Sequence, residues 1–243
     1  MLQQSVLLEN GESILMRINE YEIFKLGKPK IDYRTIGDTK IPLVVVDNFY
    51  QNPNTVRDFA LSLPYTKSKY VCLNSPGERV NLELDIRIIR DVTYKLMRLQ
   101  TSNIKPNPAA VTFNKMNGGE KLEALQINPH VDDINNLNTA MIVYLNKPNE
   151  CEGGTAFYRH KRTGLEICKT QEQVASTFDD FPKLTRTEYD DFITESNDEW
   201  ELIDMVKMKY NRMIVYPPNV FHSAYLTKDN FLEYDRITQL GFF

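Results

Sequence analysis

The second half of the chain is a succession of short apolar segments separated by turn residues, and this pattern restricts the fold more than any other feature. Gly-Gly pairs at 118–119 and 153–154 and a Pro-Pro pair at 217–218 interrupt the apolar runs. Short strands with turn residues between them are typical of a β-sandwich or barrel. The runs that predict strands are AVTFNKMN (110–117), LEALQINPHVD (122–132), TAMIVYL (139–145), TAFYRHK (155–161), ELIDMVKMK (201–209), RMIVYPP (212–218) and RITQLGFF (236–243).

The first hundred residues mix strand and helix patterns. Loose alternation over 13–26 predicts one or two short strands, and the β-branched run 41–47 predicts a buried strand. Asn52-Pro53 is a typical helix start, and Pro64 ends that helix.

A second helix is expected over about 82–100, where apolar residues form one stripe, after a loop at 73–81. Helices followed by many strands indicate an α+β, mainly β fold. We expect a single domain over 1–243, in which 1–109 supplies strands and supporting helices for a core built from 110–243.

Composition excludes several classes of partner. The net charge is −4 with both signs mixed along the chain, so nucleic acid is an unlikely partner. No apolar run approaches the ~20 residues of a membrane span, and the start of the chain lacks a signal-peptide pattern. The three cysteines, Cys72, Cys151 and Cys168, are odd in number and irregularly spaced, which indicates a reducing, cytoplasmic location. The oligomeric state is left open.

The stretch NPHVDD at 128–133 carries the first sign of chemistry. His130 and Asp132 are two apart, so on a strand both point to one face. Together they offer two of the three ligands of a 2-His-1-carboxylate triad, which binds Fe(II) and leaves coordination positions open. Many surface strands carry such a pair by chance, but His222 follows another strong strand and can supply the third ligand.

Arg236 lies 14 residues after His222 and opens the apolar strand at the end of the chain. A buried guanidinium normally needs an anionic partner. A dicarboxylate ligand would supply one through a bidentate pair.

Five features in this order resemble the Fe(II)/2-oxoglutarate-dependent oxygenases, and most closely the branch that contains the prolyl 4-hydroxylases. The resemblance covers roughly residues 110–243 and implies a double-stranded β-helix, or jelly roll. The segments that carry it are HVD (130–132), MIVYLNKP (141–148), GGTAFY (153–158), RMIVYPPNVFHSA (212–224) and RITQLGFF (236–243).

The resemblance implies a role for each matching residue. His130, Asp132 and His222 would bind iron, and Arg236 would pair with the C5 carboxylate of 2-oxoglutarate. Tyr144 matches a tyrosine whose hydroxyl reaches the same carboxylate, although it could equally be a core aromatic.

Two further polar residues are weaker candidates for the same site. Thr238, two residues after the arginine, could add a hydrogen bond to the co-substrate, with a structural role as the alternative. Gln126 lies four residues before His130 on the expected strand, and it could touch co-substrate or substrate.

The activity implied by the resemblance is hydroxylation of an unactivated C–H bond with Fe(II), 2-oxoglutarate and O₂, releasing succinate and CO₂. The substrate would be a small molecule, an amino acid, or a peptide or protein side chain. The carboxylate of Asp132 leaves no vacant ligand position for halide, which favours hydroxylation over halogenation. Two alternatives stay open: a catalytically silent jelly roll that binds a ligand or partner, and a cupin-like metalloenzyme that does not use 2-oxoglutarate.

Residues 165–198 interrupt the strand pattern with a polar, acidic composition and four scattered aromatics. Long connections of this kind are usually functional lids or disordered. The aromatics argue against pure disorder. We expect a mobile, partly helical cover over the mouth of the barrel that contacts substrate.

Overall fold

The fold is taken from a computed structural model that describes residues 2–7, 13–18, 20–67, 76–83, 87–99, 110–119, 122, 124–134, 139–178 and 192–243. The strands are β1 (Leu2–Leu7), β2 (Ser13–Ile18), β3 (Lys30–Ile36), β4 (Ile41–Asp47), β5 (Glu78–Glu83), β6 (Ala110–Met116), β7 (Ala140–Tyr144), β8 (Gly154–His160), β9 (Trp200–Lys207), β10 (Met213–Tyr216), β11 (His222–Tyr225) and β12 (Arg236–Phe242). The helices are α1 (Glu20–Ile23), α2 (Pro53–Leu61), α3 (Arg87–Leu96), α4 (Ala124–Ile127) and α5 (Gln171–Phe178), with a 3₁₀ turn η2 at Pro148–Glu150.

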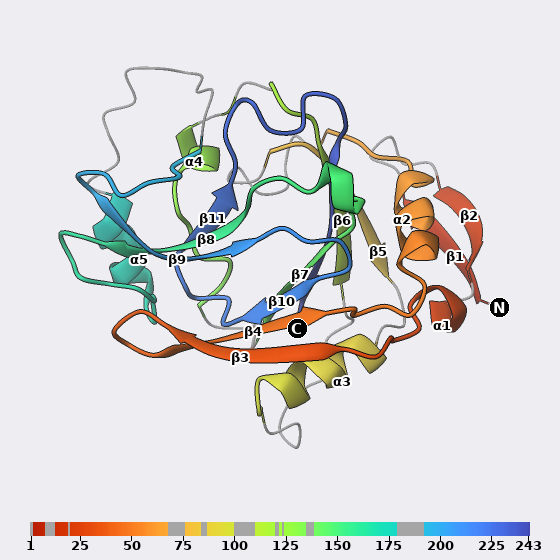
Figure 1. Cartoon of the computed structure of the whole chain (residues 1–243), viewed down its shortest axis with the longest axis horizontal. Coiled ribbons are helices and arrows are strands. Elements are labelled where there is room, and N and C mark those ends of the chain that lie inside the picture. Colours follow the sequence, from red (N-terminus) through yellow and green to blue (C-terminus); the bar gives the residue numbers. More distant parts are fainter. Residues whose placement is uncertain are drawn as a thin grey trace.

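A seven-stranded antiparallel sheet forms the body of the molecule, in the order β3-β4-β10-β7-β12-β6-β5. β12 lies between β7 and β6, so the last strand of the chain is central in this sheet. A separate hairpin, β1–β2, lies at the opposite side of the molecule from α5 (Figure 1).

A three-stranded sheet, β11-β8-β9, faces part of the larger sheet. The segment around His130 extends it, because His130 forms an antiparallel bridge with His222 on β11. From β6 onward the chain therefore alternates between the two sheets. β6, β7, β10 and β12 belong to the larger sheet, and the His130 segment, β8 with β9, and β11 belong to the smaller sheet and its extension.

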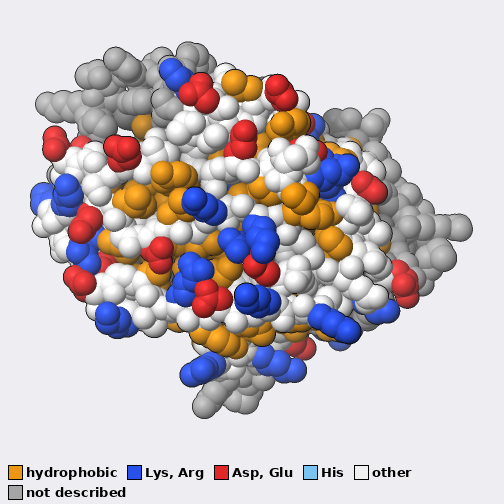
Figure 2. Space-filling view, in the orientation of Figure 1, with side chains coloured by type: hydrophobic (Ala, Val, Ile, Leu, Met, Phe, Trp, Pro, Cys, Tyr) orange, Lys and Arg blue, Asp and Glu red, His pale blue; other side chains and the backbone are white. Residues whose placement is uncertain are grey.

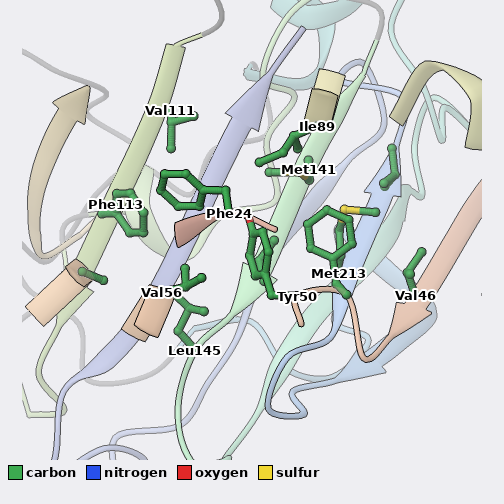
Figure 3. Close-up of a cluster of buried hydrophobic side chains, with 14 of the residues drawn as sticks. Phe24, Val46, Tyr50, Val56, Ile89, Val111, Phe113, Met141, Leu145 and Met213 are labelled. Atoms are coloured by element: carbon green, nitrogen blue, oxygen red, sulfur yellow. The ribbon is translucent and has the colours of Figure 1, made fainter. Parts of the chain in front are cut away.

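One face of the seven-stranded sheet packs against α2 and α3 and is apolar. Alternate residues of each strand point to it, including Val111 and Phe113 of β6 and Ile237 of β12. Val56 of α2 and Ile89 of α3 are fully buried against the same cluster, and Figure 3 shows how these side chains interlock.

The intervening residues of the same strands point to the other face, toward the three-stranded sheet. Tyr144 of β7, Ile214 and Tyr216 of β10 join Phe157 of β8 in a second buried cluster. The residues of β6 and β12 on this face are partly polar, and they lie where the candidate site is found.

Most of the predicted strands are confirmed. The runs expected over 41–47, 110–117, 139–145, 155–161, 201–209, 212–218 and 236–243 contain β4, β6, β7, β8, β9, β10 and β12, and the helix expected after Asn52 is α2.

Other element predictions are wrong. The run 122–132 is not a strand, because 124–127 form the short helix α4 and only His130 makes a strand-type bridge. Within the expected loop 73–81, residues from 78 onward belong to β5, which shortens the expected 82–100 helix to α3. Residues 20–23, expected as strand, are the helical turn α1. Pairing with β6 overrides the turn-forming residues near β5.

The segment 165–198 is less superficial than expected. It contains α5, in agreement with the expected helix, but both of its described ends are built into the fold. Ile167 forms a strand-type bridge with Val220, and Cys168, Glu166 and Phe192 are buried. Residues 179–191, with Phe181 and Tyr189, lie outside the described residues, so the expected cover is not tested there.

The surface carries charges of both signs, which are interspersed on the face shown in Figure 2. No helix within the described ranges has the length and apolar character required to cross a membrane. Cys151 and Cys168 have free thiols, and Cys72 lies outside the described residues.

Candidate metal centre

Backbone pairing positions the three predicted ligand residues. His130 and His222 exchange both main-chain hydrogen bonds, each with an N···O distance of 2.9 Å. The amide of Asp132 donates to the carbonyl of Pro218 at 2.8 Å, which holds the turn after His130 beside the Pro-Pro corner. All three side chains are therefore fixed by main-chain contacts between segments about ninety residues apart.

The three side chains converge. Asp132 Oδ1 lies 3.8 Å from His130 Nε2, and Asp132 Oδ2 lies 3.4 Å from His222 Nε2. One ligand atom from each residue lies within 4.8 Å of the others. Atoms bound to one ion at about 2.1 Å lie about 3 to 4 Å apart. The donor set and its spacing thus fit one first-row transition-metal ion.

The protonation states also suit metal binding. His222 donates from Nδ1 to the carbonyl of Val220 at 3.0 Å, so the lone pair of Nε2 faces Asp132. Burial, and then repulsion from a protonated His222, lowers the pKa of His130 to about 3 and keeps that imidazole neutral at pH 7. Burial raises the pKa of Asp132, against the opposing effects of a protonated His222 and of Arg79. A cation is the partner that such a buried carboxylate requires.

A cavity of about 130 Å³ opens onto the three ligand residues. Its floor is the polar face of the large sheet, with Arg79 of β5, Asn114 of β6, and Arg236 and Thr238 of β12. Its other walls are mostly apolar. The remaining lining residues are Met141, Ile142, Thr155, Tyr216, Ser223, Ala224, Leu240 and Phe242.

Several polar atoms of this cavity are buried without a hydrogen-bond partner among the described residues. They include the Nε atoms of Arg236 and Arg79, Thr238 Oγ1, Asn114 Oδ1 and Asp132 Oδ2. A buried donor or acceptor without a partner costs about 1–3 kcal/mol, and more for a charged group. A folded protein retains such groups together when a ligand satisfies them. Two guanidinium groups line the cavity, and they are complementary to an anionic ligand.

Tyr144, Gln126 and His160, the other residues singled out in the sequence, do not line the cavity. The hydroxyl of Tyr144 lies 2.7 Å from Thr155 Oγ1, and Tyr144 is fully buried behind that lining residue. Gln126 lies on α4 and is not among the lining residues, so its expected place on a strand face with His130 is wrong. The third histidine, His160, packs on Trp200 in another buried cluster.

Sequence reasoning missed Arg79, Asn114 and Tyr216. Arg79 and Asn114 are direct cross-strand partners, and Asn114 in turn pairs with Thr238. Burial raises the pKa of Tyr216 well above its ordinary value, so its hydroxyl stays protonated and can donate into the cavity. The signal for Tyr216 was available, since it is the last residue of the strand that precedes the Pro-Pro corner.

Comparison with known proteins places the chain in one family. The family model DUF6445, described as a family of unknown function, matches residues 27–239. Among curated protein sequences, none matches the chain.

Three solved structures illustrate the similarity found at the level of coordinates. A prolyl-4-hydroxylase from Pseudomonas putida is 10% identical, covering 77% of this chain and 80% of its own, with a TM-score of 0.42. A prolyl hydroxylase from Trichoplax adhaerens, in complex with a hypoxia inducible factor peptide fragment, is 14% identical with 83% coverage of both chains and a TM-score of 0.41. HygX from Streptomyces hygroscopicus, with nickel and 2-oxoglutarate bound, is 12% identical with 82% coverage of both and a TM-score of 0.38.

Proposed function

The chain belongs to the DUF6445 family, and we propose that it is an Fe(II)- and 2-oxoglutarate-dependent dioxygenase that hydroxylates an unactivated C–H bond. One observation carries the proposal. A single cavity combines a His-Asp-His donor set with a buried arginine whose Nε has no partner among the described residues. A metal ion held by His130, Asp132 and His222, and a carboxylate held by Arg236, would satisfy these groups.

The order of the strands supports a double-stranded β-helix as the scaffold. Successive strands from β6 to β12 alternate between the two sheets, as in a jelly roll, except that β8 and β9 are neighbours in the smaller sheet. The ligand residues lie on the smaller sheet and its extension, and Arg236 lies on the larger one. The reacting groups would therefore be enclosed between the sheets.

The metal-binding residues would be His130, Asp132 and His222, two neutral imidazoles and one carboxylate. When bound, Fe(II) with 2-oxoglutarate would activate O₂, giving succinate, CO₂ and a hydroxylated product. Main-chain pairing between His130 and His222 would hold the ligand side chains in place, and the apolar part of the wall would limit the access of water to the reacting atoms.

Arg236 would bind the distal carboxylate of 2-oxoglutarate. Its side chain is buried, and burial lowers the pKa of the guanidinium without neutralising it. Thr238, two residues along the same strand face, offers Oγ1 to the same ligand. Tyr144 would act through Thr155, which it orients by their hydrogen bond.

The test is an anaerobic titration of the purified protein with Fe(II) and then 2-oxoglutarate, followed by admission of O₂ and measurement of succinate. We expect one iron per chain, 2-oxoglutarate binding that depends on the iron, and succinate that exceeds a His222→Ala control. Iron binding without 2-oxoglutarate binding would indicate the cupin-like alternative. Binding of neither would leave the silent ligand- or partner-binding jelly roll.

A further inference from the structure

We propose that the substrate carries a carboxylate that Arg79 binds, so that the enzyme acts on a small organic acid such as a free amino acid or a hydroxy acid. This inference rests on the proposed function of the same site. The cavity contains a second arginine, Arg79, in addition to the Arg236 assigned to 2-oxoglutarate.

Arg79 faces the cavity because of its register on β5. Its neighbours Val80 and Leu82 are buried on the apolar face of the sheet, so Arg79 lies on the opposite face. Its Nε is buried without a hydrogen-bond partner, and within the described part of the chain no carboxylate pairs with its side chain. The guanidinium is therefore available to a ligand.

The two arginines enter the cavity from different strands of the sheet. Arg79 lies on β5 and Arg236 on β12, with β6 between them. Two strand spacings separate their backbones by about 10 Å. Arg79 lines the same cavity as the ligand residues His130 and Asp132.

The balance of charges in the site indicates the sign and magnitude of the charge that the substrate should carry. Asp132 offsets one of the two charges of a divalent metal, and dianionic 2-oxoglutarate offsets the other together with Arg236. Arg79, which is half-buried and has a buried Nε, would then remain as one unbalanced positive charge beside the cavity. Burying an unpaired charge is costly. A substrate with one carboxylate removes that cost, and Asn114, the cross-strand partner of Arg79, lies beside it with an unsatisfied Oδ1 for a donor such as an amino or hydroxyl group.

The experiment uses the full chain loaded anaerobically with Fe(II) and 2-oxoglutarate. A panel of free L-amino acids and 2-hydroxy acids is titrated, each acid beside its own carboxamide, and binding is followed by the shift in Tm. We expect at least one acid to bind at least about tenfold more tightly than its carboxamide, since a charge-assisted pair is lost in the amide. If no acid exceeds its carboxamide, the proposal is overturned.

Variants assign the effect to Arg79. In Arg79→Gln the preferred acid should bind no better than its carboxamide, whereas Arg79→Lys should keep part of the difference. Arg34→Gln, on the opposite edge strand β3, is the matched control and should keep all of it. If Arg79→Gln retains the preference, or weakens 2-oxoglutarate instead of the acid, Arg79 does not bind the substrate carboxylate. Failure of the proposed function is seen separately, as absence of 2-oxoglutarate binding to the unsubstituted protein before any acid is added.

Discussion

The two faces of the seven-stranded sheet are built from the same strands and differ in the character of their buried groups, which are mainly apolar on one face and partly charged on the other. On the face toward α2 and α3, Phe113 stacks on Phe24 and meets Phe59 edge to face, and the buried hydroxyl of Tyr50 donates to Gln239 at 2.8 Å. On the cavity face, Arg236 and Thr238 are buried with polar atoms that lack partners among the described residues.

The two faces therefore contribute differently to the stability of the fold and to ligand binding. Apolar burial on the helix-covered face contributes stability without any ligand. The cavity face gives up part of that stability by burying polar groups that only a ligand completes. Substitutions on the two faces should therefore move stability and binding in different combinations.

The largest effect is expected from the metal ligands. His222→Ala or His130→Ala should weaken Fe(II) binding by more than about hundredfold, beyond the loss seen when a residue that only supports a ligand is removed. Turnover should disappear as well. Metal analysis after gel filtration measures this, and His160→Gln is the control because that histidine lies outside the cavity. Full iron occupancy in either alanine variant would remove the residue from the metal site.

Arg236→Met should change binding and stability in opposite directions. Loss of the guanidinium should raise the KM for 2-oxoglutarate by roughly a hundredfold to several thousandfold, because a buried charge pair costs about 3–5 kcal/mol when one partner is removed. The ligand-free protein should become about 1–3 kcal/mol more stable, because a buried unpaired charge is replaced by an apolar side chain. Steady-state kinetics and urea unfolding check both parts. A destabilised variant with an unchanged KM would contradict the contrast between the two faces.

Phe113→Ala tests the apolar face. Removing this buried ring should lower the free energy of unfolding by about 3–5 kcal/mol, while iron and 2-oxoglutarate affinities of the folded fraction stay unchanged. Phe113→Leu should lose less, because most of the buried volume is retained. A selective loss of 2-oxoglutarate binding would show that the faces are coupled.

Glu166 provides a buried charge that is already satisfied, in contrast to Arg236. Burial alone would raise the pKa of its carboxyl, but hydrogen bonds from Thr39, Asp38 and Arg159 outweigh burial and hold the pKa at about 2. Because the folded pKa is lowered from 4.5, the carboxylate stabilises the fold above about pH 4.5 and loses that contribution as the pH falls toward 2.

Glu166→Gln should therefore lower stability by on the order of 3 kcal/mol at pH 7 and much less near pH 2. Urea unfolding across this pH range measures the effect, with Glu201→Gln as a more exposed control on the same arginine. An equal loss at every pH would show that the charge of Glu166 is not what stabilises the fold.

Local sequence patterns predicted most of the strands, but they did not predict all the residues that line the cavity. The β-branched runs of β4, β7 and β10 are buried on both faces, so their composition alone identifies them. The sequence also pointed to His130, Asp132, His222 and Arg236, which the structure brings to one cavity, and their roles in binding stay predictions.

Arg79 and Gln126 show where such reasoning fails. Arg79 follows Pro76 and Gly77, which favour a loop, and only pairing with β6 makes it part of a strand. Gln126 was placed by assuming an alternation that Asn128-Pro129 interrupts, since proline removes a main-chain donor. Both depend on contacts between distant segments, which periodicity does not contain.

The paired main chains of His130 and His222 have a further consequence. Their spacing is set by two peptide hydrogen bonds and not by the imidazoles. These two main-chain hydrogen bonds do not depend on which side chains occupy positions 130 and 222. A substitution at position 130 or 222 therefore changes a donor atom without removing either of these main-chain hydrogen bonds.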